Sequence, residues 1–257
     1  MAIAWARTRA MSQPDRFEVD PATGTVRIDG CEADSSSVEW DIPTRGTVFG
    51  TLLNYRGALA ALGNAVDAAL YEALPRAPVL YIKPANTWAA FGAEITLPAA
   101  VAAVEIGAAL GIVIGATAHR VAEREALDCV AGYTVVNDIC EPHASFHRPA
   151  IRQRCRDGFC PIGPWVIAQH EVATPEALKL RVLVNGKLAS ENTTANLIRP
   201  VARLIADVTE FMTLAAGDVL LAGVPENAPR ARAGDRVRIE IEGVGALENA
   251  LIAERRS

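Results

Sequence analysis

Apolar and polar side chains alternate through the first part of the chain, and this pattern predicts β structure. RFEVDPATGTVRIDG, residues 16–30, has two alternating runs around Asp-Pro-Ala-Thr-Gly, which is typical of a β-hairpin. GTVFGTLLNY, residues 46–55, predicts a further strand after Pro43. We therefore expect residues 1–45 to form a loose leader and a small β appendage, and residues 46–257 to form the main domain.

Two segments have the spacing of an amphipathic helix. Leu59, Leu62, Val66 and Leu70 recur three and four residues apart, which predicts a helix that starts at about Tyr55 and stops before the prolines at 75 and 78. The second predicted helix covers residues 195–215 with Asn196 as its N-cap. Its apolar face is formed by Val201, Leu204, Ile205, Val208, Phe211 and Met212.

Short apolar runs predict the remaining strands. VLYIK, residues 79–83, and LGIVIG, residues 110–115, have the length and branched side chains of buried strands. YTVVND, residues 133–138, predicts a strand that ends in two polar residues. Asn185-Gly186 is a strong two-residue hairpin turn, and residues 237–241 alternate as in a half-exposed strand. Strands outnumber helices without regular alternation, so the fold class is α+β and strand-rich.

Composition narrows the functional classes. The chain has 257 residues, 51% of them hydrophobic, and a formal net charge of −5. This balance argues against a nucleic-acid partner, because no positive excess is available for phosphates. No apolar run approaches about 18 residues, so the sequence predicts no membrane span, and the N-terminus lacks the unbroken apolar segment of a signal peptide. We expect a cytoplasmic protein.

The stretch RQRCRDGFCPIGPW, residues 152–165, places two cysteines among arginines. The spacing of Cys155 and Cys160 matches neither a CxxC redox pair nor a common zinc site. Five cysteines in a chain of this length do not indicate a disulfide framework, so we expect free thiols that pack as small core residues.

Polar residues gather at four strand or turn ends, where active sites often lie. These are residues 83–87, 137–138, 146–157 and 192–194. Taken singly, each cluster is more simply interpreted as a solvated strand end, a turn cap or surface charge. The sequence has no GxGxxG, no GxxxxGK[ST] and no GxSxG motif, so it predicts neither a nucleotide loop nor a nucleophile elbow.

The order of these motifs resembles the fumarylacetoacetate hydrolase family over about residues 46–250. The resemblance rests on GTVFGTLLNYRG, YIKPANTW, LGIVIG, AGYTVVND, RDGFCPIGPW, VNGKL, EFMTLAAGDVLLAGVP and GDRVRIEIEGVGALEN. FHRPAIRQRCRDGFCPIG is similar to the N-terminal half, or the separate small subunit, of the family's isomerase/decarboxylases of 4-hydroxyphenylacetate (homoprotocatechuate) breakdown. The resemblance implies a mixed β-sandwich roll.

The resemblance also implies a Mg²⁺ or Mn²⁺ ion held by a Glu-x-Glu pair and a later aspartate, since hard cations prefer carboxylate oxygens. Asp138 matches that aspartate, but Gly107 and Ala109 stand at the positions of the pair. Glu105 is the only nearby carboxylate, about 7 Å short of Gly107 on a strand, and could substitute only if the backbone shifts.

Family members often carry a His/Glu dyad after the Asn-Tyr motif, and here Ala58 and Ala61 stand at those positions. Neither side chain can transfer a proton. The resemblance implies substrate contacts from the remaining polar residues, in particular from arginines that can grip carboxylates. These expected substrate-binding residues are Lys83, Arg148, Arg154, Asp157 and Thr193.

Two hypotheses follow from this pattern of retained and missing residues. In the first, the chain decarboxylates 5-oxopent-3-ene-1,2,5-tricarboxylate or isomerises 2-hydroxyhepta-2,4-diene-1,7-dioate through a dienolate, stabilised by a metal or by the arginines. In the second, it is a scaffold subunit that pairs with a metal-competent paralogue. The resemblance implies a homodimer or a heteromer, and the expected small-molecule partner is a 2-oxo di- or tricarboxylate. A general 2-oxo acid hydrolase or oxaloacetate decarboxylase fits the arginine-rich stretch less well.

Overall fold

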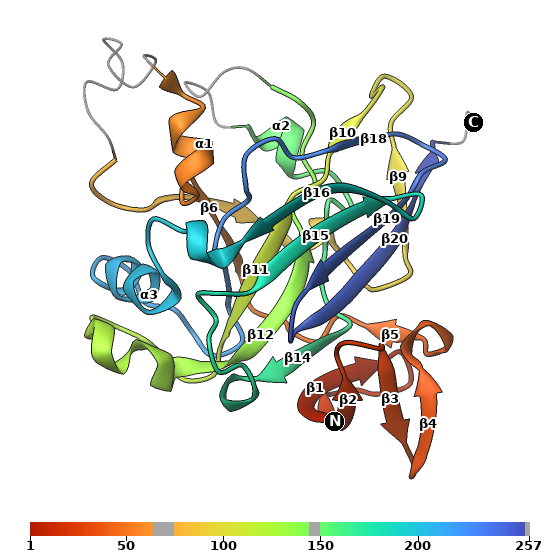
Figure 1. Cartoon of the computed structure of the whole chain (residues 1–257), viewed down its shortest axis with the longest axis horizontal. Helices are drawn as coiled ribbons and strands as arrows, with labels where there is room; N and C mark the ends of the chain where they lie inside the picture. The colour runs from red at the N-terminus through yellow and green to blue at the C-terminus, as the bar shows by residue number, and fades with distance from the viewer. Residues whose placement is uncertain (64–74, 144–149, 255–257) are drawn as a thin grey trace.

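Two β-sheets form most of the molecule, as expected for a strand-rich α+β fold. A computed structural model describes residues 1–63, 75–143 and 150–254 (Figure 1). The larger sheet has the strand order β4-β3-β2-β1-β14-β12-β11-β17-β6-β7, and β5 pairs with β1. Its strands are β1 (Ala2–Thr8), β2 (Asp15–Asp20), β3 (Thr25–Ile28), β4 (Cys31–Asp34), β5 (Trp40–Asp41), β6 (Val48–Leu52), β7 (Val79–Lys83), β11 (Ala108–Ile114), β12 (Val130–Asn137), β14 (Trp165–Ala168) and β17 (Val219–Leu221).

The second sheet has the order β16-β15-β19-β20-β9, and its middle strands lie against β12 of the larger sheet. It comprises β9 (Glu94–Leu97), β15 (Lys179–Val184), β16 (Lys187–Thr193), β19 (Arg236–Ile241) and β20 (Gly245–Ala253). Two further strand pairs join β8 (Trp88–Ala89) to β13 (Cys160–Pro161) and β10 (Val104–Glu105) to β18 (Arg230–Ala231). Both sheets are mixed, because β6–β17 and β9–β20 are parallel pairs.

Strand β11 is buried on both faces, which explains its nearly continuous apolar sequence. Leu110 and Ile112 point into the main core between the sheets, whereas Ala109 and Val113 belong to a second apolar cluster. Successive strand residues face opposite sides, so each face of β11 receives alternate residues. The predicted buried strand over residues 110–115 is confirmed for residues 110–114, whereas Gly115 lies beyond the end of β11 and is exposed.

Several other predictions from the pattern are confirmed. Strands β2 and β3 form the predicted hairpin, and Asn185-Gly186 joins β15 to β16. Asn185 has a φ of +52° and Gly186 a φ of +75°, the left-handed backbone that a tight hairpin turn requires. β7 covers the predicted residues, but its expected burial is wrong: Ile82 is 51% exposed because β7 is the last strand of its sheet.

The second predicted helix is shorter in the structure, and the first ends at Ala60 within the described residues. Among the described residues, the helices are α1 (Arg56–Ala60), α2 (Ile151–Arg154) and α3 (Val201–Thr209), with 3₁₀ turns at Ser35–Ser37, Ala85–Thr87, Glu123–Cys129, Gln169–Glu171 and Thr194–Asn196. The prediction of one helix over 195–215 is wrong, since α3 begins after Pro200. A residue that precedes proline is disfavoured in helical conformation, which separates the turn at Asn196 from α3. Predicted helix positions 66 and 70 lie outside the described residues.

The expectation of a loose leader is also corrected. β1 pairs on one side with β2 and on the other with β14, so residues 2–8 extend the larger sheet. The division into parts at residue 45 stays a prediction. No helix in the described ranges is long and apolar enough to cross a membrane.

Candidate active site

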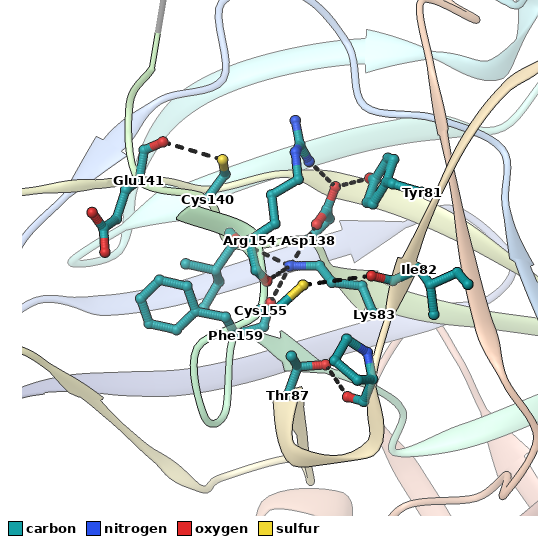
Figure 2. A network of polar contacts seen from close by, with 12 residues as sticks. Tyr81, Ile82, Lys83, Thr87, Asp138, Cys140, Glu141, Arg154, Cys155 and Phe159 are labelled. Atoms are coloured by element: carbon teal, nitrogen blue, oxygen red, sulfur yellow. Dashed lines mark hydrogen bonds and ion pairs between the residues drawn. The ribbon is translucent and has the colours of Figure 1, made fainter. Parts of the chain in front are cut away.

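Three strand and helix ends bring charged side chains together at one place. Lys83 is the last residue of β7, Asp138 directly follows β12, and Arg154 is the last residue of α2. Figure 2 shows the three side chains converging, with Tyr81 beside them. The structure therefore unites polar residues that stand up to 71 positions apart in the sequence.

The Lys83 ammonium is enclosed by oxygen atoms. Its Nζ lies 2.8 Å from Asp138 Oδ1 and donates to the backbone carbonyls of Ile139, Arg154 and Phe159 at 2.7–2.8 Å. The side chain has no solvent exposure. An ammonium has three N–H donors, and these four oxygens leave none of them for a bound molecule.

Asp138 is held through both carboxylate oxygens. Oδ2 accepts a hydrogen bond from Arg154 Nη1 at 3.0 Å and a short hydrogen bond from the Tyr81 hydroxyl. Tyr81 fits there because residue 50, opposite it on β6, is glycine: a Cβ at residue 50 would overlap the phenol ring. Arg154 also lies over this ring, 4.5 Å from its centroid, in a cation–π arrangement.

Charge balance sets the protonation of this cluster. Burial opposes ionisation of Asp138, but the positive charges of Lys83 and Arg154 outweigh it and lower the pKa of the carboxyl below 3.8. Burial and the neighbouring carboxylate raise the pKa of Tyr81 well above 10, so the phenol stays neutral. Two cations then face one carboxylate, and the cluster carries one positive charge in excess.

The excess charge is accessible only on Arg154. The Arg154 side chain is 17% exposed, whereas those of Lys83 and Asp138 are fully buried. One guanidinium nitrogen binds Asp138, which leaves further N–H donors of the planar group (Figure 2). The site therefore presents a positively charged hydrogen-bond donor, a group suited to an anionic oxygen.

The residues present do not fit the divalent ion that the resemblance implied. Gly107 and Ala109 supply no ligand atom, and Ala109 is packed in the second apolar cluster with Val48 and Val136. A Cβ on Gly107 would lie 2.5 Å from the carbonyl oxygen of Asp138 and 3.0 Å from Val224, so the backbone has closed around the glycine. Asp138, the one matching ligand, has both oxygens engaged by cations and a phenol.

Glu105 does not complete such a site. It lies on β10, which is separate from β11, and β10 pairs with β18 so that Glu105 stands opposite Arg230. Its carboxylate lies 3.9 Å from the Arg230 guanidinium. In the described ranges, no three His, Cys, Asp or Glu side chains come together as a metal site would require.

The other predicted site residues have separate surroundings. Ala58 lies within α1 and Ala61 directly follows it. Asp157 accepts a hydrogen bond from Asn86 and lines a surface cavity of about 490 Å³. Thr193 caps the 3₁₀ turn after β16 by accepting from the Ala195 N–H. Arg148 lies outside the described residues.

The cysteines of the arginine-rich stretch are free thiols. Cys160 is buried, and burial raises the pKa of its thiol to about 12, so it is an uncharged core residue as expected. Cys155 is only partly buried, which the expectation of core packing missed.

Tyr81 is a site residue that sequence reasoning missed. It stands two positions before Lys83 on the same strand, so strand alternation places both side chains on one face. This two-residue spacing is the sequence signal that places Tyr81 on the same face as Lys83. The close approach between Tyr81 and Asp138 depends on tertiary structure, since 57 residues separate them.

Comparisons with known proteins agree with this fold. The family model described as "Fumarylacetoacetate (FAA) hydrolase C-terminal" matches residues 47–252. A 4-hydroxyphenylacetate degradation bifunctional isomerase/decarboxylase from Escherichia coli is 39% identical over 211 residues, which are 82% of this chain and 48% of that protein. The chain thus spans about half the length of the first curated relatives that it matches.

Two solved structures are similar over the full length of both chains. A 5-carboxymethyl-2-hydroxymuconate delta-isomerase from Mycobacterium smegmatis superposes with a TM-score of 0.79 at 26% identity. A 2-hydroxyhepta-2,4-diene-1,7-dioate isomerase from Mycobacterium marinum gives 0.78 at 25% identity.

Proposed function

The chain belongs to the fumarylacetoacetate hydrolase family, and we propose that it is a carboxy-lyase/isomerase whose dienolate is stabilised by Arg154 instead of a divalent ion. The expected substrates are 5-oxopent-3-ene-1,2,5-tricarboxylate and 2-hydroxyhepta-2,4-diene-1,7-dioate. Relatives that are isomerases and decarboxylases support this reaction class. The observation that carries the proposal is the single positive charge in excess at the buried Lys83–Asp138–Arg154 cluster.

Both reactions need an electron sink. In decarboxylation the bond to the leaving carboxylate breaks, CO₂ departs, and the electron pair moves through the conjugated chain to the oxo oxygen. In isomerisation the dienol loses its hydroxyl proton and forms the same kind of anion. A guanidinium N–H aimed at that oxygen stabilises the charge as it develops, most strongly where water is excluded.

The other two charged residues have positioning roles in this scheme. Asp138 holds the Arg154 guanidinium through Nη1, and Lys83 holds Asp138 while binding the backbone of residues 139, 154 and 159. A fixed guanidinium needs no reorganisation when charge develops, which favours catalysis over simple binding. Arg154 can also bind a substrate carboxylate through its remaining donors.

Arg154→Met tests this proposal most directly. CO₂ release and loss of dienol absorbance would be followed for the wild type, for Arg154→Met, and for Arg154→Lys, which keeps the charge. We expect kcat to fall by about 10²–10³-fold in Arg154→Met, as for loss of a charge-stabilising donor, and less in Arg154→Lys. Arg152→Met is the matched control, because Arg152 lies exposed on the same helix.

The second part of this test measures whether the activity depends on a divalent metal ion. Activity of the wild type is expected to persist in the presence of a chelator such as EDTA. A wild type that is inactive with EDTA and recovers with Mg²⁺ would overturn the assignment of Arg154 as the electron sink.

A scaffold subunit is the second candidate function. It is supported by the alanines at the two dyad positions, by the missing ligands, and by the match to only half of the curated relatives. In this case the purified chain turns over neither substrate, and activity appears on mixing with a paralogous subunit that has an intact Glu-x-Glu pair. Turnover by the chain alone, at a rate that added paralogue does not change, would exclude the scaffold function.

A further inference from the structure

Near the candidate active site, two buried polar atoms lack a hydrogen-bond partner among the described residues. Glu226 Oε2 and the hydroxyl oxygen of Tyr55 are buried and have no hydrogen-bond partner in the described part of the chain. Tyr55 has no solvent exposure. Burial raises the pKa of this phenol, so it is neutral. A buried polar atom without a partner costs free energy unless a ligand or water satisfies it.

The surroundings of Glu226 place its carboxylate against Gly57 at the start of α1. A Cβ on Gly57 would overlap this carboxylate, and Gly57 directly precedes Ala58. The other oxygen, Oε1, accepts a hydrogen bond from Asn192 at 3.3 Å. Figure 1 shows the short turn that follows β16 beside the base of α1, and Arg56 donates there to the carbonyl of Ala195 at 2.7 Å.

The loop that carries Glu226 also packs against Gly107, beside the backbone of Asp138. A Cβ on Gly107 would lie 3.0 Å from Val224 and 2.5 Å from the carbonyl oxygen of Asp138. Glu226 follows Val224 by two residues, so their Cα atoms are at most about 7 Å apart. The carboxylate and the cationic cluster therefore lie at the same end of the larger sheet.

We propose that Glu226 is the proton-transfer residue of the isomerisation and delivers the proton to carbon in place of the absent His/Glu dyad. This inference rests on the proposed function and extends it. The geometry points to Glu226 because its unpaired oxygen is buried and lies against Gly57, the residue before Ala58 at the first dyad position. The Tyr55 hydroxyl, which has no partner among the described residues, is a neutral hydrogen-bond donor for the substrate.

The proposed step is balanced in atoms and electrons. The 2-hydroxyl proton of the dienol leaves to water, the C2–O bond becomes a carbonyl, and the C2=C3 double bond moves to C3=C4. The electrons of the C4=C5 bond then form a C5–H bond with the proton of the Glu226 carboxylic acid. Water returns a proton to the Glu226 carboxylate, and no oxidant or reductant takes part.

This assignment separates the two reactions. Decarboxylation ends at a dienol, whose oxygen exchanges protons with water directly, so it needs no proton on carbon. Isomerisation forms a C–H bond, which needs a positioned acid. We expect Glu226→Gln to lower kcat of isomerisation about 10²–10⁴-fold with KM changed less than about threefold, and to leave decarboxylation within about threefold of wild type.

The experiment compares wild type, Glu226→Gln and Glu210→Gln with both substrates. Glu210 is exposed at the end of α3 and provides the matched control, whose two activities should equal those of wild type. Isomerisation in D₂O would be followed by proton NMR, since the enzymatic product carries deuterium at C5.

Gly57→Ala gives an independent variant that leaves Glu226 itself intact. The added methyl displaces the end of a flexible side chain, and alanine is about 1 kcal/mol better than glycine in a helix, so the fold should be retained. Because the methyl group moves the carboxylate, we expect the isomerisation rate to fall at least about tenfold. The decarboxylation rate should not change.

The outcomes distinguish the two proposals. Isomerisation that survives in Glu226→Gln and Gly57→Ala would overturn the role of Glu226 and leave the proposed function standing. Equal loss of both reactions in a folded Glu226→Gln would also overturn it, since this indicates a structural role. A wild type inactive toward both substrates would overturn both proposals together.

Discussion

Lys83 and Asp138 form a fully buried ion pair, with Nζ 2.8 Å from Oδ1 and neither side chain exposed. Desolvation of two charges is costly, and here the cost is offset by three backbone carbonyls on the lysine side and by Arg154 and Tyr81 on the aspartate side. The pair fixes the end of β7 to the end of β12. Because Asp138 also binds the Arg154 guanidinium, the pair holds Arg154 in its orientation.

Removing the lysine charge should strongly destabilise the fold. Lys83→Met leaves three carbonyls without their donor and Asp138 without its nearest cation, so we expect the free energy of unfolding to fall by about 3–5 kcal/mol. Urea denaturation followed by circular dichroism measures this change. Lys179→Met, at an exposed position, is the matched control and should change stability by no more than about 0.5 kcal/mol. Equal effects of the two substitutions would contradict the structural role of Lys83.

Acid should weaken the same cluster. The pKa of Asp138 is lowered in the folded protein, so the carboxylate stabilises the fold fully above its ordinary value of 3.8, and this contribution is lost as pH falls through the lower folded pKa. Asp138→Asn lacks this titration. The difference in unfolding free energy between wild type and Asp138→Asn should be constant from about pH 7 to 5 and should shrink below about pH 4. A difference that stays constant to pH 3 would show that folding does not lower the pKa of Asp138.

Divalent metal should not stabilise the protein. A site whose Kd is one hundredth of the Mg²⁺ concentration would add about 2.7 kcal/mol of stability, whereas the donor set here predicts no change in Tm. Calorimetric titration of the metal-stripped chain with Mg²⁺ and with Mn²⁺ gives the direct measurement. Binding heat that Asp138→Ala abolishes would mean that Glu105 or another carboxylate has rebuilt the site.

Restoring glutamates tests why the metal site is absent. In Gly107→Glu/Ala109→Glu, the first side chain must push against the Asp138 carbonyl and the second enters an apolar cluster. We expect lower stability and no gain of Mg²⁺ affinity by the same calorimetric measurement. A gain of binding would show that the two missing carboxylates are the whole cause of the loss.

Asn54 should be essential for joining the start of α1 to the region before α3. Its amide donates to the carbonyls of Arg199 and Ala222 and accepts from the Arg199 N–H, and it is 1% exposed. Asn54→Ala leaves these buried groups unsatisfied, so we expect a loss of about 3 kcal/mol in unfolding free energy. Asn196→Ala is the control, since this exposed amide donates a single hydrogen bond to Asn192 and should cost less than about 1 kcal/mol.

The sequence by itself determined most of the strands and the family. Alternation predicted the β2–β3 hairpin, Asn185-Gly186 predicted the β15–β16 turn, and an apolar run predicted β11. These features depend on neighbours in the chain, where side-chain period and backbone preference act locally. The motif series likewise identified Asp138 as the matching metal position and Gly107 and Ala109 as its missing partners.

Only the tertiary structure decided what the site contains. Tyr81 and Asp138 are 57 residues apart, and Lys83 reaches the carbonyl of Arg154 across 71 residues, so no local pattern shows that these groups neutralise one another. The same holds for Glu226, which reaches the start of α1 from a loop after β17. The pKa of a carboxylate is set by its burial and by the charges within a few ångströms, and these depend on packing between segments distant in sequence.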